Sequence, residues 1–214
     1  MLDANLVNQI YNILKRKIVN GELKSGQKIN IKIFSQEFKV SPTPIREVLG
    51  RLIKDGFIIN LSRRGYYVVR IKKRDLEEIY ELRQLIEGYS LKYAIQNIRE
   101  SKLKELLKDI SRLKREGKGI EKEEDFYNID KKLHVMIVRS CPNRRLNKIY
   151  LQMFDIVRMV INIDNTKIEN TIYLNDCIHL IEAILEKDLL KSKEILKSHI
   201  NRSLNRLIVI LKEV

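Results

Sequence analysis

Three histidines and two cysteines are the side chains of this 214-residue chain best suited to bind a transition metal. Two of them, Cys177 and His179, stand two residues apart in the stretch DCIHLI (176–181). In a helix these two positions point about 200° apart, because each residue turns the helix by about 100°. At most one of the two can therefore face a given site.

The spacing Asp130-x-x-x-His134 places a carboxylate and an imidazole on one face of a helix expected over residues 121–141. The same face carries four apolar residues, Phe126, Leu133, Ile137 and Cys141. Both polar groups are therefore expected to point into a core, where a carboxylate is costly unless it is paired or bound to a cation. Two alternatives remain: half of a divalent-metal site, or an Asp–His hydrogen bond that satisfies both groups.

Helical spacing also predicts which residue of DCIHLI faces inward. Cys177 lies in an apolar stripe with Leu174, Leu180, Ile181 and Ile184, whereas His179 falls on the opposite, polar face. His199 lies at the edge of another apolar stripe, where it either lines a pocket or borders it. The alternative to a ligand role for Cys177 is a small buried hydrophobe, the commonest fate of a free cysteine.

Arg83 and Glu87 are two further charged residues expected on an inward helix face. Their apolar neighbours at helical spacing are Leu76, Ile79, Tyr80 and Ile86. The two charges either pair with each other, or Arg83 binds the carboxylate of an effector that enters the helical core. Arg83 and Glu87 are therefore candidate effector-binding residues.

Composition and charge indicate the class of protein and its division into domains. No apolar run approaches the roughly 20 residues that span a bilayer, and the N-terminus lacks the apolar block of a signal peptide. We therefore expect a cytoplasmic protein without membrane contact, and two cysteines fit a reducing compartment. The net charge of +14 is uneven, since residues 1–74 hold 16 Lys/Arg and 5 Asp/Glu, whereas residues 75–214 hold the remaining 26 and 23. A basic block joined to a near-neutral one is typical of a polyanion-binding module on a second domain.

The first 72 residues carry the pattern of a winged helix-turn-helix. Helices are expected over 6–19 and about 31–38, and a third begins at Ser41 and is stopped by Gly56. The stretch FIINLSRRGYYVVRI then predicts a two-stranded hairpin around Arg63-Arg64-Gly65. From residue 75 only amphipathic helices are expected, over about 75–98, 101–115, 121–141, 143–165, 169–187 and 189–212. The predicted fold is mainly α: a winged helix-turn-helix domain (1–72) followed by an all-α bundle of about six helices (75–214).

Double-stranded DNA is the partner that this basic half predicts. In a helix-turn-helix the second helix of the pair lies in the major groove, and here that helix presents Arg46. The Arg46 guanidinium can pair bidentately with guanine, so it is the best candidate for reading a base. The other candidate contacts are Lys32, Ser41, Thr43, Arg51, Arg63, Arg64 and Gly65. A solvated surface charge is the alternative for any single cation, but the whole array indicates DNA.

The segment NGELKSGQKINIKIFSQEFKVSPTPIREVLGRLIKDGFIINLSRRGYYV (20–68) resembles the GntR-family DNA-binding domain, whose pattern includes VS-x-TPVREAL-x-RL. The resemblance implies base and phosphate contacts from Lys32, Thr43, Arg46, Arg64 and Gly65. Many members carry Arg where this chain has Pro42, which removes one expected contact and leaves the operator sequence open.

Three later segments, LRQLIEGYSLKYA, DKKLHVMIVRSCPN and DCIHLIEAILEKDLLKSKEILKSHI, resemble the all-helical FCD ligand-sensing domain of the FadR subgroup. Its metal-binding branch uses an Asp, a His four residues later and two further His. Asp130, His134 and His199 match three of these positions, and Cys177 takes the place of the remaining His. Either Cys177 is a thiolate ligand, favouring zinc, nickel and similar ions, or the metal site is weakened and the cavity binds an organic effector alone.

These observations together predict a homodimeric transcription regulator that binds an inverted-repeat operator and responds to a small effector, an organic acid by the resemblance, with a divalent ion in the helical domain. One alternative is a metal-dependent hydrolase, because an Asp/His site with an open position can activate water. No H-E-x-x-H, P-loop or nucleophile elbow is present, however, so we expect no enzymatic activity. A second alternative is a nonspecific DNA-packaging protein.

Overall fold

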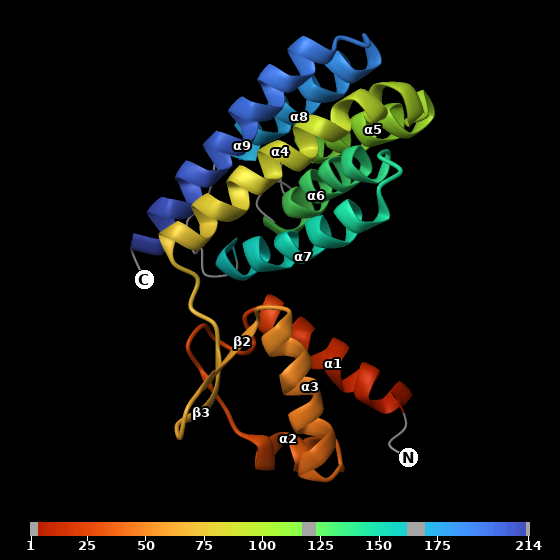
Figure 1. Ribbon diagram of the computed structural model, residues 1–214. Coiled ribbons are helices and arrows are strands. Elements are labelled where there is room, and N and C mark those ends of the chain that lie inside the picture. The colour runs from red at the N-terminus through yellow and green to blue at the C-terminus, as the bar shows by residue number, and fades with distance from the viewer. Residues whose placement is uncertain (1–3, 117–122, 162–169, 213–214) are drawn as a thin grey trace. The chain divides into compact units, whose positions relative to one another are not determined.

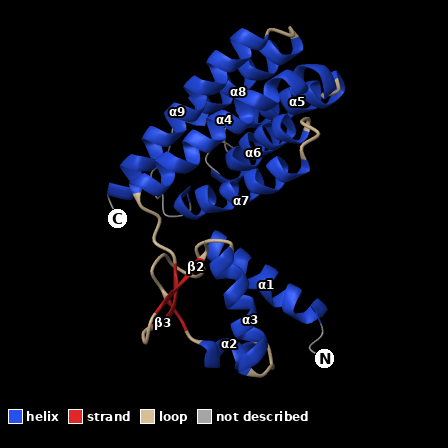
Figure 2. Ribbon diagram, viewed as in Figure 1, coloured by secondary structure: helices blue, strands red, loops and turns tan. Residues whose placement is uncertain are grey.

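The computed structural model describes residues 4–116, 123–161 and 170–212, which form nine helices and a three-stranded sheet (Figures 1 and 2). The chain divides into two compact units, residues 1–72 with 155–164 and residues 73–154 with 165–214. None of the described helices is both long and apolar enough to cross a bilayer.

The first unit contains α1 (Ala4–Val19), α2 (Ile31–Glu37) and α3 (Pro42–Lys54) with a small antiparallel sheet. The sheet is built from β1 (Lys28–Ile29), β2 (Ile58–Leu61) and β3 (Gly65–Val68) in the order β1-β3-β2. The predicted hairpin is β2–β3, which pairs Ile58 with Val68 and Leu61 with Gly65. The sequence prediction missed β1 because two residues are too few to show an alternating pattern.

Local signals determine where α3 begins and ends. Ser41 is extended at the N-cap position and Pro42 and Pro44 occupy the first turn, where a missing N–H costs nothing. The helix stops before Gly56, whose φ of +82° is a left-handed conformation that glycine adopts freely. Its inward face is fully buried against α1 and consists of Ile45, Val48, Leu49 and Leu52. This packing holds the polar face of α3 outward.

The second unit is all helical, as expected for residues 75–214. Its helices are α4 (Lys73–Asn97), α5 (Glu100–Glu116), α6 (Glu123–Arg139), α7 (Arg144–Ile161), α8 (Asn170–Leu185) and α9 (Leu189–Lys212). The last part of α7, from Asp155, groups with the first unit. The expected helix boundaries at 121, 165 and 169 lie outside the described residues. Helix α4 packs against α6, α8 and α9, and α8 packs against both α6 and α9. These four helices enclose the interior that holds the polar residues described next.

Candidate metal centre and DNA-binding surface

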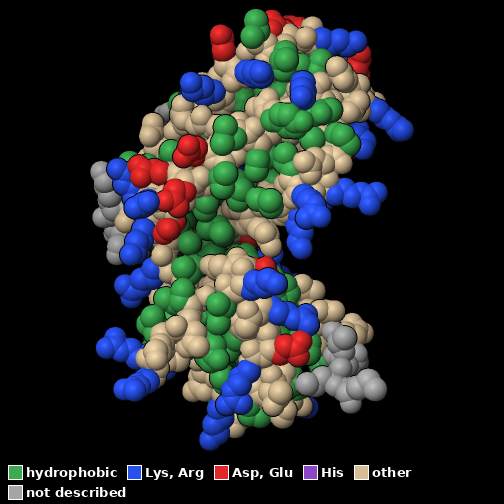
Figure 3. Space-filling view, viewed as in Figure 1, with side chains coloured by type: hydrophobic (Ala, Val, Ile, Leu, Met, Phe, Trp, Pro, Cys, Tyr) green, Lys and Arg blue, Asp and Glu red, His purple; other side chains and the backbone are tan. Residues whose placement is uncertain are grey.

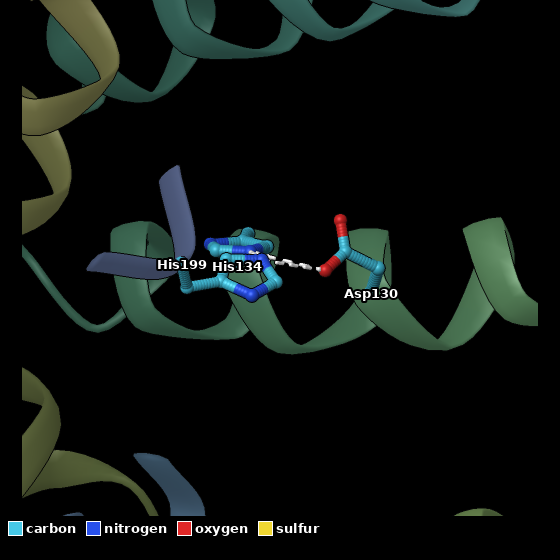
Figure 4. A group of neighbouring side chains, drawn as sticks. All are labelled: Asp130, His134 and His199. Carbon is cyan, nitrogen blue, oxygen red and sulfur yellow. Dashed lines mark hydrogen bonds and ion pairs between the residues drawn. The ribbon is translucent and has the colours of Figure 1, made fainter. Parts of the chain in front are cut away.

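Three side chains converge in the interior of the helical unit, Asp130 and His134 from α6 and His199 from α9 (Figure 4). The Asp130 Oδ1 atom lies 3.3 Å from His134 Nε2 and 3.0 Å from His199 Nε2. The two Nε2 atoms lie 3.0 Å apart. Both histidines are almost fully buried, so one oxygen and two nitrogens face a common point away from bulk solvent.

The triangle of these three atoms has the size that one metal ion requires. Bonds of about 2.0–2.1 Å to histidine nitrogen and carboxylate oxygen place neighbouring ligand atoms about 3.0 Å apart at octahedral angles and about 3.3 Å apart at tetrahedral angles. The edges of 3.0, 3.0 and 3.3 Å fall in that range. Three protein ligands of this kind leave at least one position on the ion for another group.

Each histidine of the triangle has a second carboxylate beside its other ring nitrogen. A hydrogen bond joins His134 Nδ1 to Glu87 Oε2, and His199 Nδ1 lies 3.4 Å from Asp176 Oδ2. A carboxylate at Nδ1 favours the tautomer that carries its proton there, which leaves Nε2 with a free lone pair for a metal. The second contact is longer than an ordinary hydrogen bond, so it orients its ring less strongly.

Arginines hold both of these carboxylates. Arg83 Nε donates to Glu87 Oε1 at 3.0 Å inside the core, and Arg202 Nη1 lies 3.1 Å from Asp176 Oδ2. Counting Asp130, the cluster contains three carboxylates against two guanidinium groups. A further positive charge is needed for balance, and either a histidine proton or a bound cation can supply it.

The pKa shifts reflect this charge balance. Burial opposes ionisation of Asp130, but His134 and His199 outweigh it and hold the Asp130 pKa well below its usual range. Burial likewise disfavours charged His134, but Glu87 and Asp130 raise the His134 pKa to about 9. For Glu87 the positive neighbours His134 and Arg83 overcome burial and lower the pKa to about 2. Asp130 and Glu87 are thus ionised and attract positive charge into the triangle.

Cys177 faces inward and His179 faces solvent, as helical spacing predicted. The Cys177 Sγ atom lies 3.8 Å from Asp130 Oδ1 and outside the group of ligand atoms that are within 4.8 Å of one another. Burial and the neighbouring Asp130 carboxylate raise the Cys177 pKa well above its usual value. The thiol therefore donates weakly to Asp130 in this arrangement and borders the triangle.

Arg83 and Glu87 pair with each other, which was one of the two alternatives for them. The Arg83 guanidinium also lies between two aromatic rings, 4.9 Å from the centre of Tyr80 and 4.8 Å from that of Phe154. Its Nη2 atom is buried and has no hydrogen-bond partner among the described residues. Glu87 has both oxygens engaged, so its direct effect is on the orientation of His134.

Sequence reasoning missed the support roles of three residues, Glu87, Asp176 and Arg202. Glu87 was expected either to pair with Arg83 or to lie beside an effector, and neither Asp176 nor Arg202 was singled out. The charged residues of these helices offer no signal in the sequence that separates such partners from surface pairs. Only the packing of α4 against α6 brings Glu87 to His134, and only the packing of α8 against α9 brings Asp176 to His199 and Arg202.

In the winged unit, most of the predicted DNA contacts lie on the surface. Lys32, Ser41, Thr43, Arg46, Arg63 and Arg64 are all exposed. The side chains of the four cations among them form no ion pair within the part of the chain that the structure describes. Figure 3 shows Lys and Arg side chains at the hairpin end and along the lower edge of this unit. The α3 surface and the hairpin tip thus offer free positive charge.

Arg51 differs from these exposed, unpaired cations because its guanidinium is bonded within the fold, and the hairpin tip is distinguished by its backbone conformation. The Arg51 guanidinium is held by Asn8 Oδ1 at 2.7 Å and Glu47 Oε1 at 2.8 Å, so it ties α3 to α1. At the tip, Arg63 has φ +62° and Gly65 has φ +97°, which makes the turn between β2 and β3 tight. Because Arg51 is engaged within the fold, Arg46 remains the best candidate on α3 for a base contact.

A winged helix-turn-helix with free cations, followed by a helical bundle, defines a DNA-binding transcription regulator. Comparison with protein families supports this class: residues 6–68 match the gntR family of bacterial regulatory proteins, and residues 78–202 match the FCD domain. The chain belongs to the GntR family of transcriptional regulators, in the FadR subgroup whose C-terminal domain is FCD.

Relatives with curated descriptions agree with this family. The HTH-type transcriptional regulator YdhC of Bacillus subtilis, described as uncharacterized, is 27% identical over 96% of this chain and 92% of its own length. The gluconate operon transcriptional repressor of the same species is 26% identical over 82% of this chain and 74% of its own length. Both are transcriptional regulators rather than enzymes, which argues against the hydrolase alternative.

Solved structures show the same fold at low identity. Escherichia coli McbR/YncC superposes with a TM-score of 0.77 at 21% identity, covering 97% of this chain and 98% of that one. A metal-free FCD domain superposes with a TM-score of 0.58 at 22% identity, covering 68% of this chain and 99% of that one. These similarities establish the architecture of the chain.

Proposed function

We propose that this regulator is a cytoplasmic homodimer whose affinity for an inverted-repeat operator is set by a divalent ion and an organic-acid effector in the helical unit. The observation that carries the proposal is the convergence of Asp130 Oδ1, His134 Nε2 and His199 Nε2 within 3.3 Å of one another. Two imidazole nitrogens and one carboxylate oxygen suit zinc or nickel.

An effector carboxylate can complete the coordination of such an ion. Carboxylate oxygen is a common metal ligand, and three protein ligands leave room for it. Arg83 adds a second polar element, because its buried Nη2 lacks an acceptor among the described residues. Arg83 contacts the Glu87 oxygen that does not bond to His134. We therefore propose that Arg83 Nε orients Glu87 and that Arg83 Nη2 donates to a second acceptor on a larger effector.

Helix α4 gives the site a route to the DNA-binding unit. It carries Arg83 and Glu87, and it begins at Lys73, where the chain leaves the winged unit. A ligand that binds two arrangements of the chain with different affinities shifts the population between them. We propose that the ion and effector act on operator affinity through α4 in this way.

An apolar row on α4 supports the homodimer. Leu82, Leu85 and Tyr89 follow helical spacing and are 45%, 63% and 47% exposed. Figure 3 shows hydrophobic side chains gathered over this part of the helical unit. We expect Leu85→Glu to shift the protein to a monomer in analytical ultracentrifugation, whereas Leu190→Glu, an exposed leucine on α9, should leave the dimer intact. A dimer that survives Leu85→Glu would rule out this surface.

The metal part of the proposal is tested on protein stripped with a chelator and dialysed. Calorimetric titration with zinc or nickel should show one site per chain, absent in His134→Ala and retained in the matched surface variant His179→Ala. Absence of uptake by the wild-type protein would refute the metal centre.

The regulatory part is tested separately, with an operator selected from a random DNA pool. Fluorescence anisotropy of that operator should show a change of affinity when the stripped protein is reloaded, and His134→Ala should abolish the change. An unchanged affinity would refute the regulatory role even if metal binds. Footprinting separates a regulator, which protects a discrete site, from a packaging protein, which covers DNA uniformly.

A further inference from the structure

A cavity lies on the helical unit, on a different face of α6 from the Asp/His triangle. It has a volume of about 520 Å³ and is bordered by the end of α4, the start of α5 and α6. The α6 residues that line it, Lys132, Val135, Met136 and Arg139, follow the spacing of one helix face. Asp130 and His134 occupy another face of the same helix. Cavities of this size are typical of small-molecule sites.

The charge of this cavity is entirely positive. Four of its nine lining residues are cations, Arg99, Lys102, Lys132 and Arg139, and none is acidic. Lys132 is partly neutralised by Asp109 at 3.0 Å. Arg99, Lys102 and Arg139 are exposed and form no ion pair with any described residue. Residues 75–214 as a whole carry only three more basic than acidic residues, so the cavity concentrates charge that the domain otherwise balances.

The remaining lining is apolar or already engaged in the fold. Ile98, Val135 and Met136 are partly buried and provide apolar contact area. Asn97 Nδ2 donates to the Ser140 backbone carbonyl at 3.1 Å, which ties the end of α4 to the end of α6. The wall is thereby held in place, and recognition of a ligand falls to the three free cations and the apolar floor.

We propose that this cavity is a second ligand site, which binds a small, multiply charged oxyanion with a short apolar body. Arg99 and Arg139 can each pair bidentately with phosphate or carboxylate oxygens, and Lys102 adds a point charge. The apolar part of the ligand packs on Ile98, Val135 and Met136. A phosphate ester and a dicarboxylate share this chemistry, and the site is independent of the metal centre.

Two probes distinguish the sources of such an anion: phenyl phosphate, a phosphate ester, and phthalate, a dicarboxylate. Each carries two negative charges at neutral to mildly alkaline pH and an apolar ring. Binding is followed on the stripped protein by calorimetry and by the NMR shift of the Met136 methyl group. We expect saturable binding of at least one probe with a shift at Met136, and binding of only one probe identifies the preferred anion.

Variants locate the bound probe. Arg99→Gln combined with Arg139→Gln should weaken binding at least about tenfold, because it removes two charge-assisted contacts. The matched control Lys193→Gln with Lys197→Gln removes the same charge from exposed positions on α9 and should leave binding unchanged. His134→Ala should also leave it unchanged.

Three results would overturn the second site. The first is no saturable binding of either probe up to about 10 mM, well above the range of a useful small-molecule affinity. The second is an equal loss in the Lys193/Lys197 control, which would show nonspecific attraction to a basic protein. The third is loss of binding in His134→Ala, which would place the probe at the metal centre. Failure of metal uptake alone leaves this proposal standing.

Discussion

Replacing Glu87 with glutamine tests whether the carboxylate behind His134 prepares the metal centre. Glu87 is fully buried, and its two oxygens accept from Arg83 Nε and His134 Nδ1. Glutamine has nearly the same shape but only one acceptor atom and an NH₂ group in place of the other. Neither orientation of the amide can therefore satisfy both donors.

Each orientation of the new amide has a cost for metal binding. With the amide oxygen toward His134, the NH₂ group faces Arg83 Nε and leaves that buried donor unpaired. With the NH₂ group toward His134, the ring must accept at Nδ1 and carry its proton on Nε2, where the metal should bind. Loss of such a supporting partner lowers metal affinity about tenfold to a hundredfold, equal to about 1.4–2.7 kcal/mol. We expect zinc or nickel affinity to fall by that amount.

The substitution also affects the fold, and the assay must separate the two effects. Breaking a buried ion pair by removing one partner costs about 3–5 kcal/mol, because Arg83 stays charged in the core. Thermal unfolding of the stripped protein should show this loss, and calorimetric metal titration is performed at a temperature where circular dichroism reports a folded variant. Glu182→Gln removes the same charge from an exposed position of α8 and serves as the control. A folded Glu87→Gln protein with wild-type metal affinity would refute the reasoning.

Three further predictions follow from the same geometry. Asp176→Asn should lower metal affinity by about tenfold at most, less than Glu87→Gln does, and should change thermal stability little. The reason is that the contact between Asp176 and the His199 ring is long and partly exposed. Cys177→Ala should weaken metal binding severalfold, because it removes the thiol that contacts Asp130, whereas His179→Ala should not. The cobalt-loaded wild type should lack a thiolate-to-metal absorption band. Such a band would show that Cys177 is a ligand. Arg46→Ala should cost about 1–3 kcal/mol of operator affinity and relax base preference in a mobility-shift competition, whereas Arg51→Ala should mainly lower the thermal unfolding temperature. A reversal of that order would show that Arg51 leaves Asn8 to contact DNA.

The winged unit was predictable almost element by element because its signals are local. Ser41, Pro42 and Gly56 determine the ends of α3 by their own backbone preferences, and the apolar spacing determines which face of α3 is buried. The single strand that was missed, β1, forms only because β3 offers it a hydrogen-bonding edge. A two-residue strand has no pattern of its own and depends on its tertiary partner.

The candidate metal centre was predictable only in part. Asp130 and His134 share α6, so their four-residue spacing places them together wherever the helix packs. Glu87 on α4 and Asp176 on α8 come from helices other than those of the two histidines, and their approach to the rings depends on how these helices cross α6 and α9. Helical spacing predicts which side chains point inward, and it does not predict which inward side chains meet. The support of each histidine by a carboxylate and an arginine is therefore a property of the bundle.

The Glu87–Arg83 pair beside His134 and the Asp176–Arg202 pair beside His199 differ in their exposure to solvent. The two sides of the candidate metal centre are therefore not equivalent. Arg83 and Glu87 are at most 2% exposed, so the His134 side of the triangle is closed. On the His199 side, the Arg202 side chain is 41% exposed and Asp176 and Asp130 are 16% and 15% exposed. The more exposed side of the triangle is therefore the one past Asp176 and Arg202, and we expect a proposed ion or effector to enter there. The Glu87 hydrogen bond is expected to fix the orientation of the His134 ring, whereas the longer Asp176 contact should leave the His199 ring freer to adjust if an ion binds.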